Sequence, residues 1–252
     1  MQESDSTTNA GLHNRKVWIM NEKPHTVKSY EDQLKNLNND LVEMGANCET
    51  ALGKAMKAIS TNDHNLADDV INSDVVIDNF ESQIENEVVN LIALRQPMAV
   101  DLRETVAALK MSSDLERIGD LAKNIAKRTK LINTHLPNNL IEAMNRICIL
   151  VQKQLKIVLD SYLSRSSDVA RTVWESDEQV DDLTNKCMEE VISLLKSNME
   201  NIEYGSHLLF VTKNIERIGD HTTNIAEQVF YLVTGDYLEG ERPKGSDSVL
   251  TK

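Results

Sequence analysis

One acidic motif with a central glycine occurs twice in this chain. Residues 116–120 have the sequence Glu-Arg-Ile-Gly-Asp, and residues 216–220 repeat it. In a helix, the glutamate and the aspartate of each copy share one face and lie one turn apart. Like charges in that arrangement repel each other unless a cation neutralises them. Each copy is therefore a candidate half-site for a metal ion.

The two copies mark an internal duplication. Among 252 residues with 40 acidic ones, about six acidic pairs of this spacing are expected by chance, so one pair alone carries little weight. Residues 114–126 and 214–226, however, share eight identities in thirteen positions. Both glycines lie in stretches with helical periodicity, where glycine is less favourable than alanine by about 0.8–1 kcal/mol. Accepting this cost twice indicates a close backbone approach or an open cavity between the carboxylates.

A second acidic pair is duplicated on the preceding predicted helix of each half. Ser-Asp-x-x-x-Asp at residues 73–78 recurs at residues 176–181, an offset of 103. Helices joined by a short turn pack antiparallel, so Asp78 is expected opposite Glu116. Asp74 then lies opposite Asp120, and a register one helical turn away is the alternative. The predicted metal ligands are Asp74, Asp78, Glu116 and Asp120 in the first half and Asp177, Asp181, Glu216 and Asp220 in the second.

The ligand chemistry favours hard cations. Four converging carboxylates carry about four negative charges, which one divalent ion halves and two cancel, so the set favours a multinuclear cluster. Oxygen ligands suit magnesium, manganese, calcium or iron. Zinc fits less well, because no His or Cys accompanies the motif in both copies. His221 follows Asp220, but its counterpart is Leu121, and we interpret it as a lone surface histidine.

Composition and hydrophobic periodicity predict an all-α fold. Nine glycines, four prolines and 4% aromatic residues are low numbers for a protein with many turns or strands. Apolar residues step by three or four from Leu34 to Ile59, the pattern of one long amphipathic helix. Helices are also predicted over about 63–93, after the cap residues of 60–63, and over about 101–133, after Pro97.

The same plan restarts after residues 134–139, which contain a proline and two asparagines. Helices are predicted over about 141–162, 168–198 and 205–233, so we expect a tandem repeat of two three-helix bundles with six long antiparallel helices. The predicted units are a flexible N-terminal extension (1–25), the first bundle (26–135), the second bundle (136–235) and a disordered tail (236–252).

Charge and cysteine usage limit the partners and the compartment. A net charge of −13 argues against nucleic acid as a ligand, because binding phosphates needs a cationic surface. Basic residues at the end of the third predicted helix, Lys123, Lys127, Arg128 and Lys130, are explained by solvation and the helix dipole. The three cysteines are far apart and are expected to be buried and reduced. With no secretory signal or long apolar run, we predict a cytoplasmic protein.

With these motifs in place, residues 26–240 resemble the PhoU family of phosphate-transport accessory and regulatory proteins. Residues 95–103, Arg-Gln-Pro-Met-Ala-Val-Asp-Leu-Arg, also look like the family's. The resemblance implies tandem three-helix bundles that bind metal clusters, with iron, manganese or magnesium as candidates, and that form a homodimer. Members of the family commonly begin near Met20, so residues 1–19 are expected to be a misassigned start or a strain-specific arm.

The resemblance also implies a non-enzymatic regulator. It would negatively regulate phosphate uptake and the phosphate regulon through the ATPase subunit of the phosphate ABC transporter and a PhoR-type sensor histidine kinase. These partners would hold it peripherally at the inner membrane. The alternative is a helical di-metal carboxylate oxidase, but such enzymes carry Glu-x-x-His pairs, and the motif here has none. An inert helical scaffold would explain the periodicity but not the repeated glycines.

Overall fold

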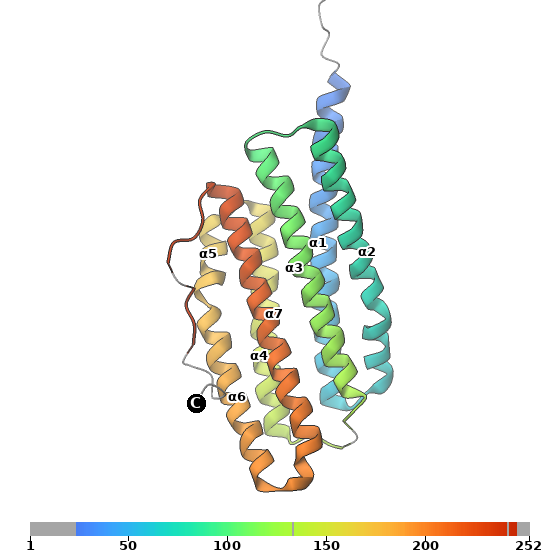
Figure 1. Cartoon of the computed structure of the whole chain (residues 1–252), viewed down its shortest axis with the longest axis vertical. Coiled ribbons are helices and arrows are strands. Elements are labelled where there is room, and N and C mark those ends of the chain that lie inside the picture. The colour runs from blue at the N-terminus through green and yellow to red at the C-terminus, as the bar shows by residue number, and fades with distance from the viewer. Residues whose placement is uncertain (1–23, 133, 241, 246–252) are drawn as a thin grey trace, which may run out of the picture.

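The computed structural model describes residues 24–132, 134–240 and 242–245, and within them it is helical without strands. Long helices lie side by side in one elongated bundle (Figure 1). Their order is α1 (Pro24–Thr61), α2 (His64–Arg95), α3 (Val100–Thr129), α4 (Asn138–Ser164), α5 (Ser167–Glu175), α6 (Asp177–Ser197), a 3₁₀ turn (Met199–Asn201) and α7 (Ile202–Thr234). The predicted all-α tandem fold is confirmed. Within the described ranges, no helix is long and apolar enough to cross a membrane.

The predicted apolar stripes form a single core that runs through both halves. Leu37, Leu41 and Met44 of α1 are fully buried, as are Val151 and Leu155 of α4. α3 packs against α1 and α2, and α7 packs against α4, α5 and α6. α3 and α7, which carry the glycine motifs, also pack against each other at the centre of the molecule (Figure 1). The three cysteines, Cys48, Cys148 and Cys187, are buried and free.

Polar contacts join α3 to α7. Asp114 accepts hydrogen bonds from Asn224 Nδ2 at 3.2 Å and pairs with His221 Nδ1 at 2.8 Å. His221 is therefore not the lone surface histidine that the sequence suggested: its side chain is 27% exposed and braces the junction of the two halves. Arg128 of α3 also contacts α7 through a cation–π interaction, because its Cζ atom lies 4.4 Å from the centroid of the Phe210 ring.

The fifth predicted helix is broken at Ser176 into α5 and α6. The side-chain amide of Gln154 on α4 donates to the carbonyl of Ser176 at 3.3 Å and to its hydroxyl at 2.8 Å. These bonds compete with helical hydrogen bonding, and Asp177 consequently occupies the first turn of α6. By the offset of 103, the equivalent of Gln154 is Ala51, which cannot make these bonds, and α2 continues through Ser73.

Side chains cap the N-terminal ends of two of the described helices, α2 and α5. Asp63 caps α2 by accepting a hydrogen bond from the Leu66 backbone at 3.0 Å. Ser166 caps α5 through Val169. α2 ends at Arg95, and its C-cap residue Gln96 adopts a left-handed conformation with φ of 49° directly before Pro97. α3 ends at Thr129, four residues before the predicted end.

The terminal segments differ from the sequence-based expectation where the structure describes them. The predicted flexible extension lies outside the described residues except for its last two positions, which begin α1. Residues 236–240 and 242–245 belong to the predicted disordered tail, yet they contact the bundle. Tyr237 stacks on Tyr231 with ring centroids 4.7 Å apart, and Leu238 packs on the core. The chain turns back after α7 and runs along α5 towards α6 (Figure 1).

Candidate metal centre

Asp74 and Asp78 of α2 and Glu116 and Asp120 of α3 form what we call the first acidic site. One cation joins two of these carboxylates: Lys123 Nζ contacts Asp74 Oδ2 and lies 3.3 Å from Asp120 Oδ1. The helices are shifted from the expected register towards the alternative one, because Gly119 packs against Ile77 and Glu81 repels Glu116 more strongly than Asp78 does. Asp74 is buried, with 5% of its side chain exposed, so its charge needs this partner. Lys123 lies one turn after Asp120 on α3, and its contacts with the two carboxylates raise its own pKa.

The other two carboxylates of the first acidic site have elevated pKa values. Burial raises the pKa of Glu116 and of Asp78, and repulsion from neighbouring carboxylates raises both further. The Oε2 atom of Glu116 is buried without a hydrogen-bond partner, although Arg117 Nη1 lies 3.4 Å away. Glu81 is a fifth carboxylate in this group, and burial raises its pKa as well. The sequence contained a signal for it, because positions 74, 78 and 81 share one helix face.

The motif glycines allow the helices to approach each other closely. A Cβ atom on Gly119 would lie 2.9 Å from Ile77 Cδ1 and 3.1 Å from its Cγ2. On Gly219 it would lie 3.1 Å from Val180 Cγ1. Ile77 precedes Asp78 and Val180 precedes Asp181, so each glycine contacts the residue beside a carboxylate of the partner helix. Of the two explanations offered by the sequence, close approach is observed rather than an open cavity.

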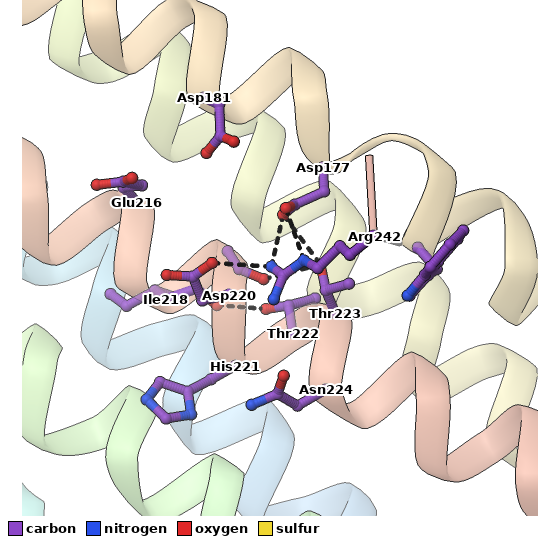
Figure 2. A network of polar contacts seen from close by, with 12 residues as sticks. Asp177, Asp181, Glu216, Ile218, Asp220, His221, Thr222, Thr223, Asn224 and Arg242 are labelled. Carbon is purple, nitrogen blue, oxygen red and sulfur yellow. Dashed lines mark hydrogen bonds and ion pairs between the residues drawn. The ribbon is translucent and has the colours of Figure 1, made fainter. Parts of the chain in front are cut away.

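Asp177 and Asp181 of α6 and Glu216 and Asp220 of α7 form the second acidic site (Figure 2). Here the cation is Arg242 of the C-terminal segment. Its Nε and Nη2 atoms bind the two oxygens of Asp177 at 2.7 and 2.8 Å, and Nη2 also binds Asp220 Oδ1 at 2.9 Å. Arg242 thus joins Asp177 to Asp220, as Lys123 joins their counterparts in the first half. In Figure 2, His221 and Asn224 lie on the opposite side of α7.

The remaining contacts of the second acidic site come from Thr223 and Lys213 of α7. Thr223 Oγ1, at the position of Lys123, donates to Asp177 Oδ1 at 3.1 Å. Lys213 Nζ pairs with the buried Oε2 atom of Glu216. Burial is the main cause that raises the pKa of Glu216 and that of Asp181. Each site therefore contains a buried glutamate oxygen next to a basic residue of its own helix, Arg117 in the first site and Lys213 in the second.

The carboxylate sets fit a metal ion in their chemistry but are not arranged around one. Within the described ranges, no three His, Cys, Asp or Glu side chains converge closely enough to hold an ion. The cations of Lys123 and Arg242 lie between the carboxylates instead. All-oxygen donor sets nevertheless suit hard cations. An ion would have to displace these two side-chain cations.

The fold and the two sites together define a class of protein: a duplicated helical bundle with one carboxylate site in each half. The PhoU domain model matches residues 41–129 and 144–229, which is more than half of the chain. The chain belongs to the PhoU family. Its motif-based resemblance to that family is confirmed.

Relatives and solved structures agree with this membership. The "Phosphate-specific transport system accessory protein PhoU homolog" of Caulobacter vibrioides is 44% identical over 221 residues, covering 87% of this chain and 96% of that protein. Its counterpart in Rhizobium meliloti is 40% identical over 221 residues, covering 87% and 93%. The crystal structure of PhoU from Pseudomonas aeruginosa superimposes with a TM-score of 0.79 at 32% identity, covering 82% of this chain and 100% of that one.

Proposed function

We propose that this protein is an accessory protein of a phosphate-specific transport system that regulates phosphate homeostasis without being an enzyme. Its curated relatives carry the name of such an accessory protein at up to 44% identity. The observation that carries the proposal is the combination of that relationship with two carboxylate sites in equivalent positions. The proposed role is to restrain phosphate uptake and the phosphate regulon when phosphate is plentiful.

Metal binding is the part of the proposal that concerns the two acidic sites. Asp74, Asp78, Glu116 and Asp120 would hold iron, manganese or magnesium in the first half, and Asp177, Asp181, Glu216 and Asp220 in the second. The ion would supply positive charge that tethers one helix to the next. Asp74 and Asp177 are the most buried members of their sites, with 5% and 3% exposed. Such a tether would hold α2 against α3 and α6 against α7, and so shape the surface that partners contact.

The proposed partners lie at the cytoplasmic face of the membrane. They are the ATPase subunit of the phosphate ABC transporter, a PhoR-type sensor histidine kinase and a second copy of this chain. A cytoplasmic location suits three buried, free cysteines, whose pKa values are all raised by burial. The net charge of −13 argues against nucleic acid as a partner.

A complementation experiment tests the proposal. Cells that lack the gene receive the wild-type chain, the double variant Glu116→Gln plus Glu216→Gln, or the control Glu142→Gln plus Glu178→Gln. Both control residues are exposed, and both double variants change the net charge equally. In phosphate-rich medium we measure a phosphate-regulon reporter, recovery of the transporter ATPase and the sensor kinase with the tagged chain, and metal content of the purified protein.

We expect wild type and control to repress the reporter, retain both partners and contain metal. The site variant is expected to lose metal and repression. A wild-type chain that recovers neither partner and does not repress the reporter would contradict the regulatory proposal. Equal metal content in the site variant and the control would contradict the assignment of these carboxylates as ligands.

A further inference from the structure

The C-terminal segment supplies the cation of the second acidic site from outside its helices. Arg242 makes three hydrogen bonds of 2.7 to 2.9 Å to Asp177 and Asp220, and only 18% of its side chain is exposed. Figure 2 shows its guanidinium between these two carboxylates. Charge-assisted bonds of this bidentate kind are among the strongest and most directional in proteins. The segment is therefore attached at the site rather than merely close to it.

A second contact fixes the same segment three residues further on. The backbone N–H of Gly245 donates to Asp181 Oδ2 at 3.0 Å. A Cβ atom at this position would lie 2.5 Å from Asp181 Cβ and 3.1 Å from the Asp182 backbone nitrogen, so only glycine fits so close to α6. Three of the four carboxylates of the second acidic site are thus bound by the segment. Glu216, which pairs with Lys213 of its own helix, is the exception.

In the first acidic site, the cation belongs to a helix of the site itself rather than to the C-terminal segment. Lys123 is part of α3, whereas the equivalent position of α7 is Thr223, which is neutral and reaches only Asp177. Without Arg242, the second site would contain four carboxylates and a single neighbouring lysine, Lys213. Arg242 of the C-terminal segment therefore supplies the positive charge that α7 lacks at position 223.

We propose that the C-terminal segment is a built-in plug of the second acidic site: Arg242 and a metal ion exclude each other there. Both Asp177 oxygens and one Asp220 oxygen that an ion would need are taken by the guanidinium. The exclusion rests on the metal binding proposed above, whereas the docking of the segment does not. Since coupling is reciprocal, a partner that captures the tail opens the site, and an ion that enters the site releases the tail.

Metal affinity of the second site tests the exclusion. Glu116→Gln disables the first site in every sample, so that Mn²⁺ binding, followed by the EPR signal of the free ion, reports on the second. Arg242→Ala is compared with Lys244→Ala, which removes the same charge from an exposed position two residues away. We expect Arg242→Ala to bind Mn²⁺ at least about tenfold more tightly, and Lys244→Ala to stay within about twofold of its parent.

A nitroxide on the tail tests the docking independently. The label is attached to Lys244→Cys, because Cys48, Cys148 and Cys187 are buried and unreactive towards the reagent. Its EPR spectrum is expected to report restricted motion in the otherwise unchanged chain. Motion should increase when Arg242→Ala is added, or when Mg²⁺, which does not disturb the spectrum, is titrated.

The outcomes separate this proposal from the one on which it rests. If the parent protein binds Mn²⁺ and Arg242→Ala binds it with the same affinity, the proposal that the segment is a plug is wrong. A label equally mobile with and without Arg242 overturns the docking. If no variant binds Mn²⁺, the proposed metal binding and the exclusion both fail, and a label released by Arg242→Ala then establishes the tail contact alone.

Discussion

The two acidic sites contain equivalent carboxylates but different cations. In the first, Lys123 is a residue of α3 and cannot leave the neighbourhood of Asp74 and Asp120. In the second, Arg242 belongs to a segment that follows α7 and can leave as the segment moves. Duplication thus preserved the spacing of the negative charges, whereas their neutralisation differs between the halves. Because Lys123 belongs to a helix, the carboxylates of the first site stay neutralised. In the second site, neutralisation depends on whether the C-terminal segment is docked.

The largest effect is expected where the two sites are alike, at the motif glycines. Gly119→Val and Gly219→Val place methyl groups against Ile77 and Val180, and each should lower the free energy of unfolding by about 2–3 kcal/mol. Urea unfolding measures this. Gly53→Ala is the control, because its Cβ meets only the end of the Gln152 side chain at 2.9 Å, and it should be neutral or stabilising by up to about 1 kcal/mol. Valine at positions 119 and 219 that is tolerated as well as Gly53→Ala would contradict close helix approach.

The next effect separates the two sites. Lys123→Ala leaves Asp74 buried without its cation and should cost about 2 kcal/mol of stability at pH 7. Arg242→Ala should cost less than about 1 kcal/mol, because its bonds are offset by the entropy of ordering the tail. Urea titrations of both variants, with Lys127→Ala as the exposed control on α3, measure the difference. A larger loss for Arg242→Ala than for Lys123→Ala would reverse the proposed contrast.

We expect stability to depend on pH in the same way at both acidic sites. Burial raises the pKa of Glu116 and of Glu216 above their ordinary value of 4.5, so the folded protein holds these protons more tightly than the unfolded chain does. Each group therefore lowers stability as pH rises through the interval between 4.5 and its raised pKa, and the penalty is complete above that interval.

Replacing either glutamate by glutamine removes this penalty. Glu116→Gln and Glu216→Gln should each raise stability at pH 7 by about 1 kcal/mol in the absence of metal. The gain should vanish below pH 4.5. Thermal unfolding in chelator across this pH range measures both effects. A stability gain that increases towards low pH would contradict the raised pKa values of these glutamates.

The smallest effect is expected at the rim of the first site. Arg117 lies 3.4 Å from Glu116 and 3.7 Å from Asp120, but 60% of its side chain is exposed. Exposed ion pairs contribute little, so Arg117→Ala should change the free energy of unfolding by less than about 0.5 kcal/mol. A loss comparable to that of Lys123→Ala would show that Arg117, and not Lys123, neutralises the first site.

Local patterns in the sequence predicted the helices and the grouping of the carboxylates. Helical periodicity, the repeated glycine motif and the offset of 103 depend on residues close together in the chain, and these predicted that Asp74 and Asp120 belong to one site, although not the exact register of the two helices. The break at Ser176 could not be predicted, because Gln154 causes it from another helix. Lys123 was attributed to solvation, since a lysine one turn after Asp120 could equally point outward.

Arg242 was beyond sequence reasoning for a different reason. It follows α7 in a segment with the composition of a disordered tail, and its position at Asp177 depends on a chain reversal rather than on a local pattern. Glu81, by contrast, shared a helix face with Asp74 and Asp78 and could have been included.

Anomalous diffraction at the manganese edge, from crystals of the wild type and of Arg242→Ala soaked at the same low Mn²⁺ concentration, tests the central claim most directly. Our account predicts a manganese peak among Asp177, Asp181, Glu216 and Asp220 in Arg242→Ala, and Arg242 bound to Asp177 without a peak in the wild type. A peak at these carboxylates with Arg242 still bound to Asp177, or no peak at them in Arg242→Ala, would contradict it.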